Sequence, residues 1–95
     1  MTAPGVRTDN YIKPDGLDRM ELRQGADGEG PVLVTATLVG EIGQPAVWLI
    51  EAEGQTSATA ETRQRAIELM GDMSLVVLGV EGATLYTPPE VVALP

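Results

Sequence analysis

The amino-acid sequence predicts an α+β fold of two layers, in which one helix packs on one face of a mostly antiparallel sheet of four or five strands. Three observations predict it. Two β-rich runs flank a short turn segment, an amphipathic helical pattern follows them, and a wholly apolar run comes after the helix. The expected chain order is strand, strand, strand, helix, strand, with an optional fifth strand near the C-terminus.

The stretch from Pro31 to Glu53 is expected to form a hairpin at the centre of this sheet. Its first strand covers residues 32–39, and its second runs from residue 47 to 53 and holds Trp48, the only tryptophan. Glycine and proline make the turn between them. Both faces of the two strands begin with apolar residues, so we expect the hairpin to be covered on both sides near its turn. One cover is the helix, and the other is a partner chain or the protein's own N-terminal arm.

The residues before the hairpin are expected to contribute one strand and an arm. From Leu17 to Arg23, apolar and charged residues alternate, which is typical of a half-buried edge strand. Proline and glycine interrupt residues 1–16, so we interpret this segment as an extended N-terminal arm. Residues 17–95 then form one small α+β domain.

The predicted helix follows the hairpin. The Thr and Ser residues at 56–59 offer N-cap oxygens, and an apolar line at helical spacing continues to about Met70, where Gly71 is a natural C-cap. The run SLVVLGV at 74–80 is apolar throughout and predicts a central strand. The segment ATLYT at 83–87 adds a short strand in this interpretation. The apolar VVAL at 91–94 either closes the sheet edge or docks on another subunit.

Composition excludes several classes of chemistry. The net charge is −8, from 14 acidic and 6 basic residues, so direct binding to nucleic acid or to an anionic membrane surface is not expected. There is no Cys and no His, which excludes disulfides, thiolate nucleophiles and Cys/His metal sites. The N-terminus lacks the apolar run of a signal peptide, and no run reaches the length of a membrane span. The sequence therefore predicts a soluble protein without an export signal, located in a virion or in the cytoplasm.

Two acidic regions resemble sites only superficially. The loop GADGEG at 25–30 lacks the Lys-Ser/Thr pair of a phosphate-binding loop, and we interpret it as a plain hairpin turn. A second cluster comprises Asp9, Asp15, Asp18 and Glu21. Carboxylates do acid–base work only inside a substrate cleft, so these side chains are expected to be solvated surface. No residue is a candidate for catalysis, for cofactor binding or for metal binding, and we expect a protein that is not an enzyme.

The first functional hypothesis is a non-enzymatic structural subunit that assembles with copies of itself, most concretely a small phage-type virion protein of the cement or decoration kind. In this hypothesis the arm and the C-terminal tail bury apolar side chains on neighbouring subunits. The candidate partner-binding residues are Tyr11, Ile12, Val91, Val92 and Leu94.

The alternative hypothesis is a small acidic inhibitor or adaptor that blocks a basic surface on a protein partner; its most specific form is a phage-encoded protein that mimics nucleic acid. Its candidate residues form a predicted acidic face of Glu51, Glu53, Glu61, Glu68 and Asp72. Both hypotheses make another protein chain the partner and require no cofactor.

Overall fold

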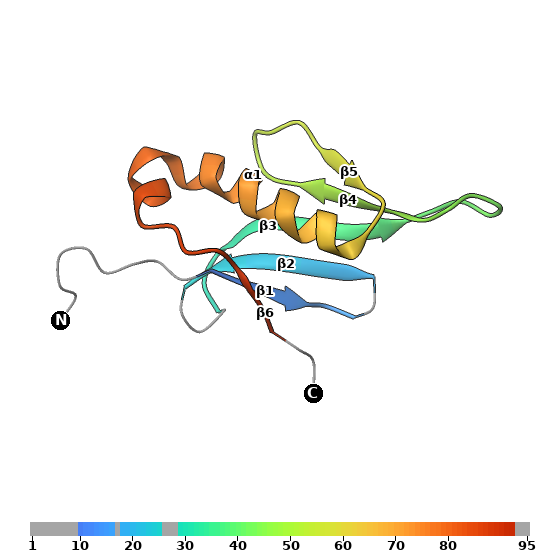
Figure 1. The fold of residues 1–95 in the computed structure, drawn as a ribbon, viewed down its shortest axis with the longest axis horizontal. Coiled ribbons are helices and arrows are strands. Elements are labelled where there is room, and N and C mark those ends of the chain that lie inside the picture. Colours follow the sequence, from blue (N-terminus) through green and yellow to red (C-terminus); the bar gives the residue numbers. More distant parts are fainter. Residues whose placement is uncertain (1–9, 17, 26–28, 93–95) are drawn as a thin grey trace.

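In the computed structural model, which describes residues 10–16, 18–25 and 29–92, one long helix lies across one face of a six-stranded sheet (Figure 1). The expected α+β fold class is confirmed, and the sheet has slightly more strands than expected. The strands are β1 (Asn10–Pro14), β2 (Arg19–Gln24), β3 (Val32–Val39), β4 (Val47–Glu51), β5 (Ala58–Ala60) and β6 (Glu90–Val91). The helix is α1 (Arg63–Thr84).

The sheet is a five-stranded meander with one added edge strand. Its spatial order is β5-β4-β3-β2-β1-β6, so strands that follow one another in the chain from β1 to β5 are also neighbours in space. These neighbours are antiparallel, and only β6 runs parallel to its neighbour β1. The predicted central hairpin corresponds to β3 and β4, in which Ala36 pairs with Ile50 and Leu38 pairs with Trp48.

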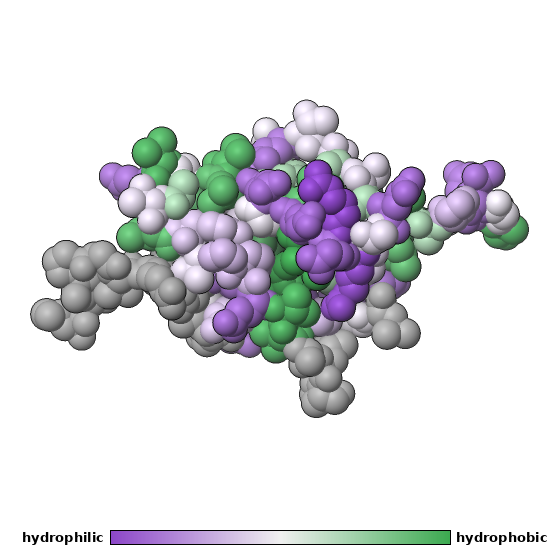
Figure 2. All heavy atoms as spheres, viewed as in Figure 1, coloured by the Kyte–Doolittle hydropathy of each residue, from purple (hydrophilic) through white to green (hydrophobic). Residues whose placement is uncertain are grey.

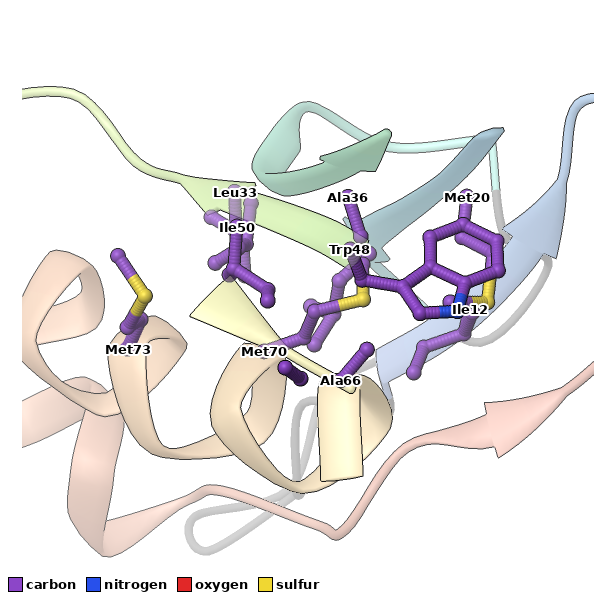
Figure 3. Packing of buried hydrophobic residues seen from close by; sticks show 12 residues of the cluster. Ile12, Met20, Leu33, Ala36, Trp48, Ile50, Ala66, Met70 and Met73 are labelled. Carbon is purple, nitrogen blue, oxygen red and sulfur yellow. The ribbon is translucent and has the colours of Figure 1, made fainter. Parts of the chain in front are cut away.

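The core lies between α1 and the sheet face that it covers. Side chains at every second position of β2, β3 and β4 point toward the helix, as the period of a strand requires. Trp48 of β4, Met20 of β2 and Ile12 of β1 belong to one core cluster with Met70 and Ala66 of the helix (Figure 3). Ile12, Ile50 and Met70 are completely buried. The chain contains no phenylalanine, so methionine and tryptophan fill the space between the layers.

The helix begins at Arg63, beyond the Thr and Ser residues at 56–59 that the sequence predicts as its cap, and ends 14 residues later than predicted, at Thr84 instead of Met70. The Thr62 side chain accepts a hydrogen bond from the Arg65 backbone N–H at 3.1 Å, which caps the first turn. Gly71 is not a C-cap: it is buried inside the helix, where an added Cβ would lie 2.9 Å from the Tyr86 hydroxyl.

The expected strand at 74–80 is therefore wrong, because these residues continue α1. An apolar run of this length is compatible with either structure, and here the preceding helix provides the next backbone hydrogen bonds without a new nucleation step. The regular helix is interrupted only at Gly79, whose φ of 76° is open to glycine at little cost. The expected short strand at 83–87 is also wrong, since Ala83 and Thr84 still belong to α1.

Two further strands lie where the sequence analysis places an arm and a cap. Within the predicted arm of residues 1–16, Asn10–Pro14 form β1 and pair with β2, while residues 1–9 lie outside the described part of the chain. Ala58–Ala60, assigned to the approach to the helix, form the edge strand β5. At the opposite edge Val91 pairs with Ile12, so the C-terminal apolar run closes the sheet edge in β6, the first of its two expected roles.

The sheet face opposite α1 carries a ladder of ion pairs. On β2, Glu21 lies between two arginines and accepts from Arg23 at 3.0 Å, while Arg19 lies 3.6 Å from the same carboxylate. Within the described residues, no helix or strand packs on this face. The second cover expected for the hairpin is therefore not supplied by any described element.

We expect Ile50→Ala to lower the free energy of unfolding by about 2–5 kcal/mol, because it removes buried methylene groups and leaves a cavity under α1. Ile42 is the matched control. It lies in the β3–β4 turn and is fully exposed, so Ile42→Ala should change stability by less than about 0.5 kcal/mol. Urea denaturation followed by tryptophan fluorescence measures both. Equal losses would show that the core is not centred on Ile50.

Candidate interaction site

The apolar residues predicted to bind neighbouring subunits do not form one exposed surface. Ile12 is completely buried in the core and Tyr11 is half-buried on the other face of β1. Val91 and Val92 are about two-fifths exposed, at 42% and 38%, and the first of them is held in β6. Leu94 lies outside the described residues. Among the described members of this set, the two valines are the exposed apolar side chains.

The predicted acidic face is divided among three places. All five of its side chains are exposed. Glu51 and Glu53 line a groove at one end of the sheet, whereas Glu68 and Asp72 line a second groove beside α1. Glu61 precedes the helix. These carboxylates therefore do not present the regular array across one face that mimicry of a nucleic-acid backbone would favour.

The second acidic region of the sequence is used in ion pairs. Asp15 lies 3.5 Å from Arg19, and Glu21 contacts both Arg19 and Arg23. Asp18 is exposed, and Asp9 lies outside the described residues. Over residues 10–16, 18–25 and 29–92, no group of three or more acidic, His or Cys side chains could hold a metal ion.

The glycine-rich loop is described only at its ends. Gln24 donates its backbone N–H to the Pro31 carbonyl at 3.0 Å, which closes the connection between β2 and β3. An added Cβ at Gly30 would lie 1.8 Å from the Gln24 carbonyl oxygen, so the loop needs glycine there for a close backbone approach. Glu29 forms an ion pair with Lys13. Residues 26–28 lie outside the described part.

The C-terminal half of α1 presents an apolar surface that the sequence analysis missed. We call it the helix-end surface and define it by Val76, Val77 and Val80, which are 67%, 39% and 86% exposed. Figure 2 shows hydrophobic side chains gathered over this part of the helix. The sequence run that forms this surface is SLVVLGV. Because the run is apolar throughout, it predicts a buried strand, whereas its valines are exposed on a helix.

A groove begins beside this surface. It has a volume of about 430 Å³ and lies where the start of β3 and the end of β4 approach α1. Its apolar wall includes Val32, Leu33 and Val77, and its two charged lining residues are Glu51 and Glu53. We call it the β3–β4 groove.

A second groove, of about 360 Å³, lies between α1 and the segment that leads to β6. Burial raises the pKa of Tyr86 above its ordinary value of 10.0; the hydrogen bond with Ser74 acts in the opposite direction, and the nearby Asp72 carboxylate raises the pKa further. Ser74 is buried and its hydroxyl donates to the Gly71 carbonyl at 2.7 Å. Tyr86 therefore packs against α1 at Gly71.

Comparison with known proteins identifies no relative. No protein-family model, no curated protein sequence and no solved structure matches this chain. Among the described residues, no helix is both long enough and apolar enough to cross a membrane.

The raised pKa of Tyr86 has a measurable consequence. In a Tyr11→Phe variant, which keeps Tyr86 as the only tyrosine, the tyrosinate absorbance should titrate with a midpoint above 10.0, and unfolding in urea should return the midpoint to about 10. The folded state holds the phenol proton of Tyr86 more tightly than the unfolded state does. The protonated phenol therefore contributes to the free energy of unfolding below pH 10, and this contribution is lost as the pH rises through the raised pKa. A Tyr86→Phe variant should lose that dependence. An unchanged midpoint on unfolding would contradict the burial of the phenol.

Proposed function

We propose that this protein is a non-enzymatic assembly subunit that associates with a second copy of itself through the helix-end surface. The observation that supports the proposal most directly is the exposure of three valines near the end of α1, two before and one after the interruption at Gly79. An exposed apolar cluster of this kind is typical of a protein interaction site, whereas singly scattered apolar residues need no explanation.

The charge distribution makes a second copy a suitable partner for this surface. Residues 73–80 contain no charged side chain, so two copies can bury this segment against each other without removing a charge from water. Asp72 and Glu81 flank the segment at the two ends and remain exposed to solvent. Specific interfaces bury roughly 800 Å² on each partner, so the contact has to extend from the valines onto the neighbouring helix surface.

We propose the setting of a small phage-type virion protein, of the cement or decoration kind, for such a subunit. That role requires binding between copies and no chemistry, which agrees with the lack of His and Cys in the sequence. The surface proposed for binding between copies differs from the one that the sequence predicts. Ile12 is buried in the subunit's own core, and the exposed valines of the helix take the binding role in this proposal. The acidic inhibitor remains the alternative, but its carboxylates are divided among separate places in the structure.

Light scattering across a concentration series tests the proposal. We expect the protein to self-associate, and we expect the double substitution Val76→Ser/Val80→Ser to weaken association about tenfold or more, because burial of each valine is worth roughly 1.5–3 kcal/mol. Ile42→Ser is the control: it changes a fully exposed apolar side chain at the far tip of the hairpin and should leave association unchanged.

Salt separates this function from the acidic alternative. Copies that each carry a net charge of −8 repel one another, so added salt should strengthen self-association through the valines. Binding of a basic partner through carboxylates should weaken with salt. A protein that stays monomeric at every protein and salt concentration, or a double-serine variant that associates as well as the unchanged chain, would overturn the proposal.

A further inference from the structure

The groove between α1 and the segment that leads to β6 has walls that the fold holds in place. We call it the Tyr86 groove; its volume is about 360 Å³. At the start of the segment, Tyr86 donates its backbone N–H to the Ala83 carbonyl at 3.2 Å. At its end, Val92 donates to the Ile12 carbonyl at 2.8 Å, which fastens the segment to the sheet edge (Figure 1). A ligand can therefore bind here without a large entropic cost for ordering the walls.

Two kinds of surface meet in the Tyr86 groove. Most of its lining is apolar, with Ile67 contributed by α1 and with Pro88 and Pro89 contributed by the returning segment. Glu68 and Asp72 of α1 also line it, and both side chains are exposed. None of the described lining residues is basic. A complementary ligand therefore carries a cationic group on an aliphatic stem.

The two carboxylates of the groove are placed to share one cation. Glu68 and Asp72 are four residues apart on α1, so they are neighbours on the helix surface, where like charges repel each other. A cation bound between them removes that repulsion. Glu68 already accepts one guanidinium, since Arg65 lies 3.3 Å from its Oε1 atom. Both members of that pair are exposed, so the pair is weak and leaves Glu68 accessible to a second cation.

We propose that the Tyr86 groove binds an arginine side chain of a basic protein partner. The aliphatic stem of that arginine packs against Ile67 and Pro89. Its guanidinium lies beside the Tyr86 phenol and pairs with Glu68 and Asp72. This inference goes beyond the proposed function and does not require association of copies through the helix-end surface.

The chemistry of the groove favours this occupant over two others. A guanidinium is more weakly hydrated than an ammonium, so arginine loses less than lysine on entering a mostly apolar groove. Two copies of this chain each carry a net charge of −8 and repel one another at long range, whereas a basic partner is attracted. Arginine on a basic protein therefore suits the groove better than lysine or a side chain of a second copy.

NMR titration of the nitrogen-15-labelled full chain tests the inference, with the peptide acetyl-Gly-Gly-Arg-Gly-Gly-amide as the probe. We expect saturable shifts of the backbone amides of Ile67, Gly71 and Tyr86. Glu68→Gln/Asp72→Asn should weaken binding about fivefold or more, the scale of two surface ion pairs. The matched control Glu51→Gln/Glu53→Gln removes the same charge from the β3–β4 groove and should leave the affinity unchanged.

Two further peptides and the Tyr86 titration sharpen the test. Norleucine in place of arginine keeps an aliphatic stem without the charge, and lysine keeps a charge without the guanidinium; both peptides should bind more weakly. The guanidinium stays charged at pH 10. Saturating arginine peptide should therefore lower the tyrosinate midpoint of the Tyr11→Phe variant, because a nearby cation favours the ionised phenol. The norleucine peptide should leave that midpoint unchanged.

Several outcomes would overturn the inference. They are the absence of saturable shifts at the groove, equal binding of the norleucine or lysine peptide, and an equal effect of the two carboxylate variants. Self-association that weakens in Glu68→Gln/Asp72→Asn would assign the groove to a neighbouring copy instead. The Val76→Ser/Val80→Ser variant separates this inference from the proposed function. It should associate weakly and still bind the arginine peptide, because neither valine lines the Tyr86 groove.

Discussion

The packing of α1 against the face of β2, β3 and β4 is the contact on which the rest of the structure depends. A chain of this length has one small core, and no phenylalanine is available to thicken it. Ala66 allows the helix to approach closely, while Met70 and Trp48 fill the remaining space (Figure 3). The first half of α1 packs against the sheet in this contact. The second half extends past it, which is why its valines are left exposed.

The sequence predicts the centre of this fold because its signals there are local. The alternation in β3 and β4 depends on neighbouring residues, and the structure agrees with it. The cap of α1 is Thr62 and not one of the residues at 56–59, because Ala58–Ala60 are used in β5. The end of the helix could not be predicted in the same way. SLVVLGV suits a buried strand or a helix equally, and the choice depends on the lack of a free central position in the sheet. β1 was missed because the proline at its end indicated an arm, although Ile12 alternates correctly for a strand.

The candidate site is harder to predict from the sequence than the fold, because it depends on how distant residues are arranged. Carboxylates are easy to count in a sequence, but whether they share a face depends on the fold, and Glu51 and Glu68 line different grooves. The exposure of Val76 and Val80 is harder still to predict. An apolar side chain is normally read as core, and only the position of the helix relative to the sheet shows that these two point away from it.

Two candidate surfaces of this protein differ in charge, and that difference limits how each can bind. The helix-end surface has no charge of its own, so it can be buried against another apolar surface, whereas the β3–β4 groove combines aliphatic walls with two carboxylates. A net charge of −8 opposes unselective association of copies at long range. In the proposed assembly, a contact that buries the uncharged valines offsets that repulsion. In the proposed assembly, this acidity restricts association to the uncharged part of the helix.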